Sequence, residues 1–263
     1  MKTRLLSRPF AWYKWYLCDH VKHVRGTYRF ANLLDSISQI GMEKVNEANA
    51  KGIEHYDWDN LVILDGCRLD TFKSTIGECR SRVALAGCTP EYIWENFSDG
   101  DYDDVVYVTG NPQLSPESFR NKTGRRIGDV FHEVFHTYRY GWDDDTGTTR
   151  PEPVLEDLET ANKLFPEKRK VAHFMQPHIP FLDSDVRSPY DSGSRNVWRM
   201  AEMGIYGHNE VKRAYSDNLR YVWDRISDSL SELDGRTLVT SDHGNFLGEN
   251  GRYDHTDYSR AKR

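Results

Sequence analysis

The chain has few cysteines, no long apolar run and no excess of basic residues. Only four of its 263 residues are cysteine, and none stands at zinc-finger spacing from another cysteine or a histidine. So few cysteines exclude a disulfide scaffold and favour reduced thiols in a cytoplasmic protein. No stretch approaches the roughly 20 consecutive apolar residues of a spanning helix. The basic, aromatic N-terminus is interrupted by polar residues, which is unlike a signal peptide.

The net charge of −6 at pH 7 argues against a general nucleic-acid-binding protein, which would carry a basic face. The hydrophobic share of 38% and charged share of 29% are ordinary for a soluble globular protein. A chain of this length can form one sizeable domain with a core, with or without an appendage.

Two regions differ in their periodicity. In residues 1–55, apolar residues such as Leu34, Ile37 and Ile40 recur at helical spacing, which predicts an N-terminal helical segment. Residues 56–263 instead alternate short apolar runs with helical patterns, at 153–165 and 211–233, which predicts a mainly parallel sheet flanked by helices. The expected strands are residues 61–64, 105–108, 171–175 and 237–240, with a weaker candidate at 82–86.

Polar side chains follow each of the four stronger strands. The runs end at Asp65, at Thr109-Gly110-Asn111, at Gln176-Pro177-His178 and at Ser241-Asp242-His243. Ligands of open α/β sheets bind at the carboxyl ends of the strands, so these side chains indicate a site. Two neighbouring buried carboxylates, Asp65 and Asp242, repel each other unless a cation or a proton lies between them. We therefore expect a divalent ion there, with His243 as a further ligand.

Carboxylate and imidazole ligands suit Mg, Mn, Ca or Zn, so the ligand types do not select the ion. The simpler alternative is that Asp65 and Asp242 only cap the turns or helices that follow them.

Three segments resemble motifs of the sulfatase and alkaline-phosphatase superfamily, in the family's order. "VILDGCRLDTF" is similar to its first metal-binding strand, "HFMQPHIPF" to a strand whose histidine faces the substrate, and "LVTSDHGNFLGENG" to its late metal motif. The resemblance covers residues 61–255. It implies an alkaline-phosphatase-like fold, metal ligands at Asp65, Asp242 and His243, and substrate contacts from His178, with Arg68 and His255 as further candidates.

The family also implies a nucleophile at a helix start, and "GCTPEYIWENF" offers two. Cys88 has the sulfatase spacing to Pro90, but Tyr92 stands where the formylglycine signature has arginine. Thr89 is therefore the preferred nucleophile and Cys88 the alternative. Thr89 could also be a simple N-cap. His178 or His255 would protonate the leaving oxygen. For Arg68, an ion pair with Asp70 is an equal alternative, and His173, inside a strand, is interpreted as a core residue.

The resemblance predicts a metal-dependent hydrolase of sulfate or phosphate esters, either small molecules or glycans. One alternative is a transferase that moves a phospho-substituent between glycans or lipids, and another is an inactive binding module of the same fold. In the family, further strands and a helix follow the histidine near this point, so the short tail after His255 indicates a compact or truncated member. The natural substrate and the oligomeric state stay open, because loops set specificity in this fold.

Overall fold

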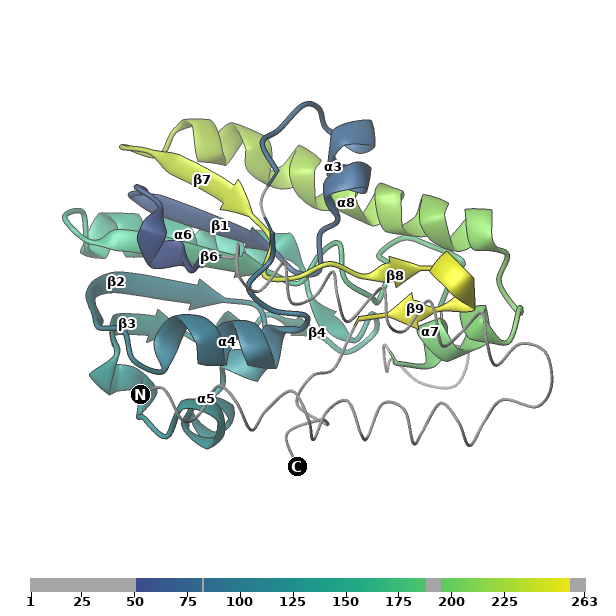
Figure 1. Ribbon diagram of the computed structural model, residues 1–263. Coiled ribbons are helices and arrows are strands. Elements are labelled where there is room, and N and C mark those ends of the chain that lie inside the picture. The colour runs from purple at the N-terminus through teal and green to yellow at the C-terminus, as the bar shows by residue number, and fades with distance from the viewer. Residues whose placement is uncertain (1–50, 82, 188–194, 256–263) are drawn as a thin grey trace. The chain divides into compact units, whose positions relative to one another are not determined.

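The computed structural model describes residues 51–81, 83–187 and 195–255, which contain a five-stranded parallel sheet (Figure 1). Its strand order is β3-β2-β6-β1-β7. The strands are β1 (Asn60–Leu64), β2 (Tyr102–Thr109), β3 (Phe131–Phe135), β6 (Arg169–Phe174) and β7 (Thr237–Thr240). Every neighbouring pair is parallel, so all five carboxyl ends lie at one edge. The predicted parallel α/β architecture is confirmed.

Alternation along the strands sends side chains to two separate cores. On one face, Leu61, Ile63 and Tyr107 pack with Tyr92 and Phe97 of α4 (Thr89–Phe97), while α5 (Pro116–Thr123) contributes Phe119. Phe97 is fully buried and lies among aromatic rings, with centroids 5.0 Å from Phe131 and 5.2 Å from Tyr102. This aromatic cluster fixes the position of α4, whose first residue is the predicted nucleophile Thr89.

Removing the Phe97 ring is expected to destabilise the fold strongly. Phe97→Ala should lower the free energy of unfolding by about 3–5 kcal/mol, because a buried ring leaves a cavity that its neighbours fill only in part. Equilibrium urea unfolding measures the loss. The control is Glu95→Ala on the exposed side of the same helix, with an expected change within about 0.5 kcal/mol. Equal effects of the two substitutions would contradict this packing.

The other face of the sheet is covered by two longer helices. Val62, Leu64 and Val106 pack against α6 (Pro151–Leu164) and α8 (His208–Ser231). In α8, buried residues recur every three or four positions, as the sequence pattern predicted, because that spacing places them on one helical face. They are Val211, Ala214, Tyr215, Asn218, Leu219, Val222, Ile226 and Leu230. The predicted helices at 153–165 and 211–233 are thus confirmed.

A third cluster lies at the carboxyl end of the sheet. Ile179, Phe181 and Trp198 pack there with Tyr215 and Leu247. It joins α7 (Arg195–Glu202) to the start of α8 and to a hairpin of β8 (Phe246–Leu247) and β9 (Tyr253–Asp254). The remaining elements are helix α3 (Leu69–Thr75), the hairpin of β4 (Trp142–Asp143) and β5 (Thr148–Thr149), and several 3-10 turns, of which the first is Ile53–His55.

Three expectations are corrected or left open. No strand forms at residues 83–86, where the short apolar run is instead part of an irregular connection from α3 to α4. The edge strand β3 was not predicted, because Phe131–Phe135 mixes polar and apolar residues without a clear run. The predicted N-terminal helical segment, 1–55, lies outside the described residues apart from 51–55. Across the described ranges, no helix is long and apolar enough to cross a bilayer.

Candidate metal centre

Three acidic and imidazole side chains meet at the carboxyl edge of the sheet. Asp65 follows β1, and Asp242 and His243 follow the neighbouring strand β7. Each is at most 3% exposed, and each offers a ligand atom within 4.8 Å of the others. His243 Nε2 lies 3.3 Å from Asp65 Oδ1 and 3.6 Å from Asp242 Oδ2. The three predicted ligands therefore form a buried group that could hold a metal ion.

Local backbone geometry brings the two strand ends together. Gly66, directly after Asp65, has a φ of 64°, and a Cβ there would lie 2.5 Å from Asn245 Nδ2. Only glycine fits this left-handed, crowded position without strain. Its N–H donates to Asp242 Oδ1 at 3.0 Å. The hydroxyl of Ser241 accepts from the N–H of Cys67 at 2.7 Å, which ties the segment after β7 to the segment after β1.

Asn111, at the end of β2, holds the first carboxylate. Its Nδ2 donates to Asp65 Oδ2 at 2.6 Å, and Asn111 is 3% exposed. The strand-end pattern drew attention to Asn111, but its bond to Asp65 depends on β6 lying between β2 and β1 in the sheet.

Thr89 reaches this group from the start of α4. Its Oγ1 donates to Asp242 Oδ2 at 2.8 Å and lies 3.5 Å from His243 Nε2. Thr89 is the first residue of the helix, Pro90 follows it in the first turn, and Cys88 is the buried N-cap residue. The free N–H groups and the positive end of a helix dipole favour an anion at this position. The structure thus places Thr89 against the candidate ligands, with Cys88 next to it in the chain.

Opposite charges dominate the electrostatics of the group. Burial would lower the pKa of His243, but the carboxylates of Asp242 and Asp65 overcome it and raise that pKa to about 9. Burial would likewise raise the pKa of Asp65, but the close contact with His243 and the charges of nearby histidines hold it well below its usual range. Without a metal, the group therefore carries a protonated imidazole between carboxylates.

This arrangement predicts how the stability of the metal-free protein depends on pH. The raised pKa of His243 contributes stability that is complete below its ordinary value of 6.5 and is lost as pH rises through about 9. The lowered pKa of Asp65 contributes stability that is complete above its ordinary value of 3.8 and is lost toward acid. Maximum stability is expected between these two values. Thermal unfolding in chelator from pH 3 to 10 tests this, and His243→Gln should flatten the alkaline decline.

A divalent cation fits the residues present. Asp65 Oδ1 is buried and has no hydrogen-bond partner in the described part of the chain, so its only compensation is the ion pair with His243. A buried carboxylate oxygen that accepts no hydrogen bond is costly, and a cation would satisfy it. Two carboxylates and an imidazole are ligands that Zn, Mn and Mg accept. Metal must displace the proton of His243, so binding should tighten as pH rises toward 9.

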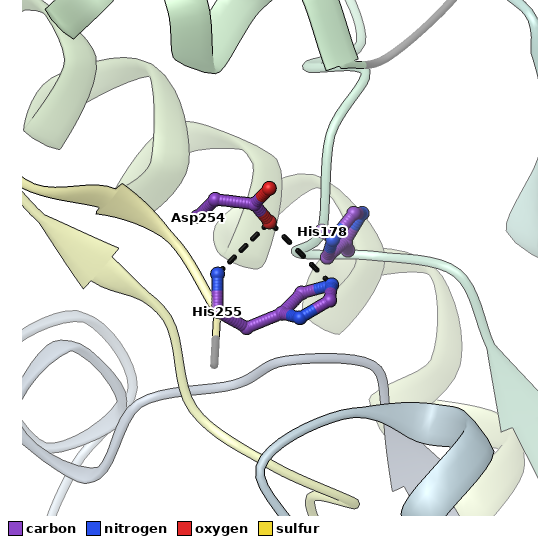
Figure 2. A group of neighbouring side chains, drawn as sticks. All are labelled: His178, Asp254 and His255. Atoms are coloured by element: carbon purple, nitrogen blue, oxygen red, sulfur yellow. Dashed lines mark hydrogen bonds and ion pairs between the residues drawn. The ribbon is translucent and has the colours of Figure 1, made fainter. Parts of the chain in front are cut away.

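A second group adjoins the first. His178, Asp254 and His255 lie side by side (Figure 2) and offer ligand atoms within 4.8 Å of one another. His255 Nε2 lies 3.4 Å from Asp254 Oδ1, and the rings of His255 and His243 are 4.8 Å apart. Asp254 has a φ of 76°, a backbone conformation that few non-glycine residues adopt and that is concentrated at functional sites. Sequence reasoning missed Asp254, although it directly precedes a predicted site residue.

Arg68 is occupied by neighbouring acids. Its guanidinium pairs with Asp70 at 2.6 Å and with Glu249 at 2.9 Å, and it donates to the carbonyl of Asn245 at 2.8 Å. The alternative ion pair with Asp70 is confirmed. A substrate contact from Arg68 stays a prediction, because a ligand would have to compete with two carboxylates.

His173 has an unexpected environment. It is fully buried in β6, as predicted, yet its Nε2 lies 3.9 Å from both Asp65 Oδ2 and Asp242 Oδ2. The predicted core position is confirmed, but the ring also lies near the candidate ligands, which the sequence did not indicate.

Comparison with known proteins adds no further assignment. No family model matches the chain, and no curated protein matches it with significant similarity.

Proposed function

We propose that this protein is a metal-dependent hydrolase of phosphate or sulfate esters, of the alkaline-phosphatase-like fold, with Thr89 as its nucleophile. One observation carries the proposal: the Thr89 hydroxyl, at a helix start, is 2.8 Å from a carboxylate of the buried Asp65–Asp242–His243 group. Nucleophilic attack on such an ester requires a hydroxyl close to an anion-binding group and a cation. Here the hydroxyl, the N-terminal end of a helix and the candidate metal ligands lie in contact.

The residues have distinct roles in this proposal. Asp65, Asp242 and His243 would hold the cation, which supplies Lewis acidity to the reacting oxygens when bound. Thr89 Oγ forms a bond to phosphorus or sulfur as its hydroxyl proton leaves toward Asp242, and the bond to the leaving oxygen breaks. Water then attacks the phosphorus or sulfur of the threonine ester, which releases the inorganic anion and restores the hydroxyl.

The leaving oxygen needs a proton, for which His178 is better placed than His255. Burial and the neighbouring histidines His243 and His178 lower the pKa of His255 to about 4. His255 is therefore neutral at pH 7 and cannot serve as the acid. Nδ1 of His178 is 2.9 Å from the carbonyl oxygen of Ile179, which orients its ring and leaves Nε2 for the substrate.

Between the two ester classes, the second group favours phosphate. Two adjacent cation sites are typical of enzymes that displace an ester oxygen at phosphorus, where one cation stabilises the attacking oxygen and the other the leaving oxygen. His178, Asp254 and His255 offer such a set beside the first group. A cation held there would stabilise the leaving oxygen in place of the proton from His178, since Nε2 of His178 cannot hold a metal and a proton together.

The test pairs metal content with hydrolysis of p-nitrophenyl phosphate, bis-p-nitrophenyl phosphate and p-nitrophenyl sulfate. We expect bound or activating divalent metal and turnover of at least one phosphate ester. Turnover of the sulfate ester alone would overturn the phosphate assignment. A protein that binds no divalent ion and cleaves none of the three would overturn the hydrolase proposal and favour an inactive binding module.

A second candidate function is transfer of a phospho-substituent to or from a lipid. A cavity of about 1230 Å³ adjoins His243 and is lined partly by apolar side chains, including Phe72, Ile76 and Trp223. Such a surface suits the apolar part of an amphiphile. A transferase would cleave simple esters slowly and would be accelerated by added lipid or glycan acceptors.

A further inference from the structure

His173 lies beneath the candidate metal centre and has no assigned role. It sits in the central strand β6, where its register partners are Ile63 of β1 and Thr109 of β2. Its side chain is fully buried, and Nε2 has no hydrogen-bond partner in the part of the chain that the structure describes. A buried polar atom without a partner is costly, so its place beside two candidate ligands calls for an explanation.

The other ring nitrogen determines the tautomer. Nδ1 of His173 lies 3.1 Å from the hydroxyl of Tyr107, which is fully buried. Within the described ranges, this is the only hydrogen bond that the Tyr107 hydroxyl makes. A phenol has one proton to donate, and Nδ1 is the acceptor within reach. The hydroxyl therefore donates to Nδ1, and the ring proton of neutral His173 is on Nε2.

That N–H faces both carboxylates at once. Nε2 is 3.9 Å from Asp65 Oδ2 and 3.9 Å from Asp242 Oδ2. Each oxygen already accepts one closer hydrogen bond, from Asn111 Nδ2 at 2.6 Å and from Thr89 Oγ1 at 2.8 Å. The positive end of one N–H dipole is thus equally close to two oxygens that otherwise repel each other.

We propose that His173 is a positioning residue that acts through Asp65 and Asp242. Its N–H holds the two carboxylates at the separation that a cation needs, with Tyr107 fixing the ring from behind. The inference rests on the proposed metal centre and deepens it. Partners that orient metal ligands typically change metal affinity by about 10–100-fold when they are removed.

Three substitutions distinguish the effect of the Nε2–H group on metal binding from the effect of the ring's volume. His173→Phe keeps an aromatic ring and removes both nitrogens. His173→Asn keeps a polar amide near the position of Nδ1 but has no group at the position of Nε2. His173→Gln can place its amide N–H near Nε2. Titration calorimetry with Mn²⁺ and Zn²⁺ should show about 10–100-fold weaker binding for the Phe and Asn variants. The Gln variant should recover most of the affinity, and Tyr107→Phe should show a smaller loss.

Folding and ligation are checked on the same proteins. Circular dichroism and thermal unfolding in chelator show which variants fold, and the Asn variant carries the test if Phe is not tolerated. Metal affinity equal to that of the wild type in the Phe and Asn variants would overturn the inference. So would an equal loss in all three variants, because the N–H would then not be the cause. Altered Co²⁺ absorption bands in the Gln variant would identify His173 as a direct ligand and also overturn it.

The outcome separates this inference from the proposed function. If the wild type binds neither Mn²⁺ nor Zn²⁺, the metal centre itself is wrong and both proposals fall. If the wild type binds metal and the variants bind it equally well, only the role of His173 falls. Thr89→Ala is the control that should keep metal binding while losing turnover.

Discussion

Thr89→Ala is expected to reduce ester hydrolysis by at least about 1000-fold while the protein still folds and binds metal. The Thr89 hydroxyl lies 2.8 Å from Asp242 Oδ2, and the residue is 5% exposed. The substitution therefore removes the attacking atom with little change in packing. Steady-state kinetics with the best p-nitrophenyl ester, beside titration of the same samples with metal, measure both properties.

Two further variants assign the nucleophile. Thr89→Ser keeps a hydroxyl and should retain part of the activity, whereas Cys88→Ala should stay close to wild type. The reverse result, an inactive Cys88→Ala and an active Thr89→Ala, would identify the cysteine as the nucleophile. A trapped covalent intermediate located by mass spectrometry distinguishes the two positions directly, although they are adjacent in the chain.

Asp242→Asn is expected to weaken metal binding by more than about 100-fold, beyond the loss that removal of an orienting partner causes. The carboxylate contributes Oδ2 to the candidate ligand set, and its Oδ1 accepts from the N–H groups of Gly66 and His243. Asparagine can keep those two hydrogen bonds through its carbonyl, so the fold should survive. The charge, one ligand atom and the acceptor of the Thr89 hydroxyl hydrogen bond are lost.

The readouts are calorimetric affinity for Mn²⁺ or Zn²⁺ and the rise in unfolding temperature that saturating metal produces. Metal that binds the native state alone stabilises it by mass action, so this rise should disappear in the variant. Asp129→Ala removes an exposed carboxylate that is paired with Arg126 and serves as the control. Undiminished metal binding by Asp242→Asn would mean that this group is not the metal centre.

Most of the fold could be predicted because its signals are local. The runs at 61–64, 105–108 and 171–175 coincide with β1, β2 and β6, since a strand buried on both faces is a continuous apolar run. The run at 237–240 coincides with β7, a half-buried strand at the other edge of the sheet. The edge strand β3 lacks that signature because part of it is exposed, with His132 and Glu133 facing solvent. Residues 83–86 have the composition of a strand, but the five-stranded sheet leaves them in a connection.

The meeting of Asp65, Asp242 and His243 was also predictable, because the last residues of parallel strands lie at one edge of the sheet. What surrounds it was not. The pairing of Asp254 with His178 brings together segments more than 70 residues apart, and the ion pair of Arg68 with Glu249 joins segments more than 180 residues apart. No periodicity links such positions, since their distance depends on how the third apolar cluster packs.

The sequence by itself determined the parallel α/β class, the edge at which ligand-capable side chains gather, and the identities of Asp65, Asp242, His243 and Thr89 as candidates. The class, the edge and the three ligand candidates follow from residue periodicity and from what each strand ends in, whereas Thr89 follows from the resemblance to the sulfatase and alkaline-phosphatase superfamily and from its place at a helix start. Only the tertiary structure decided that Thr89 contacts Asp242, and that His173 faces the carboxylates rather than the core alone. Contacts of a few ångströms between distant segments depend on the order and register of the strands, which hydrophobic patterning does not specify.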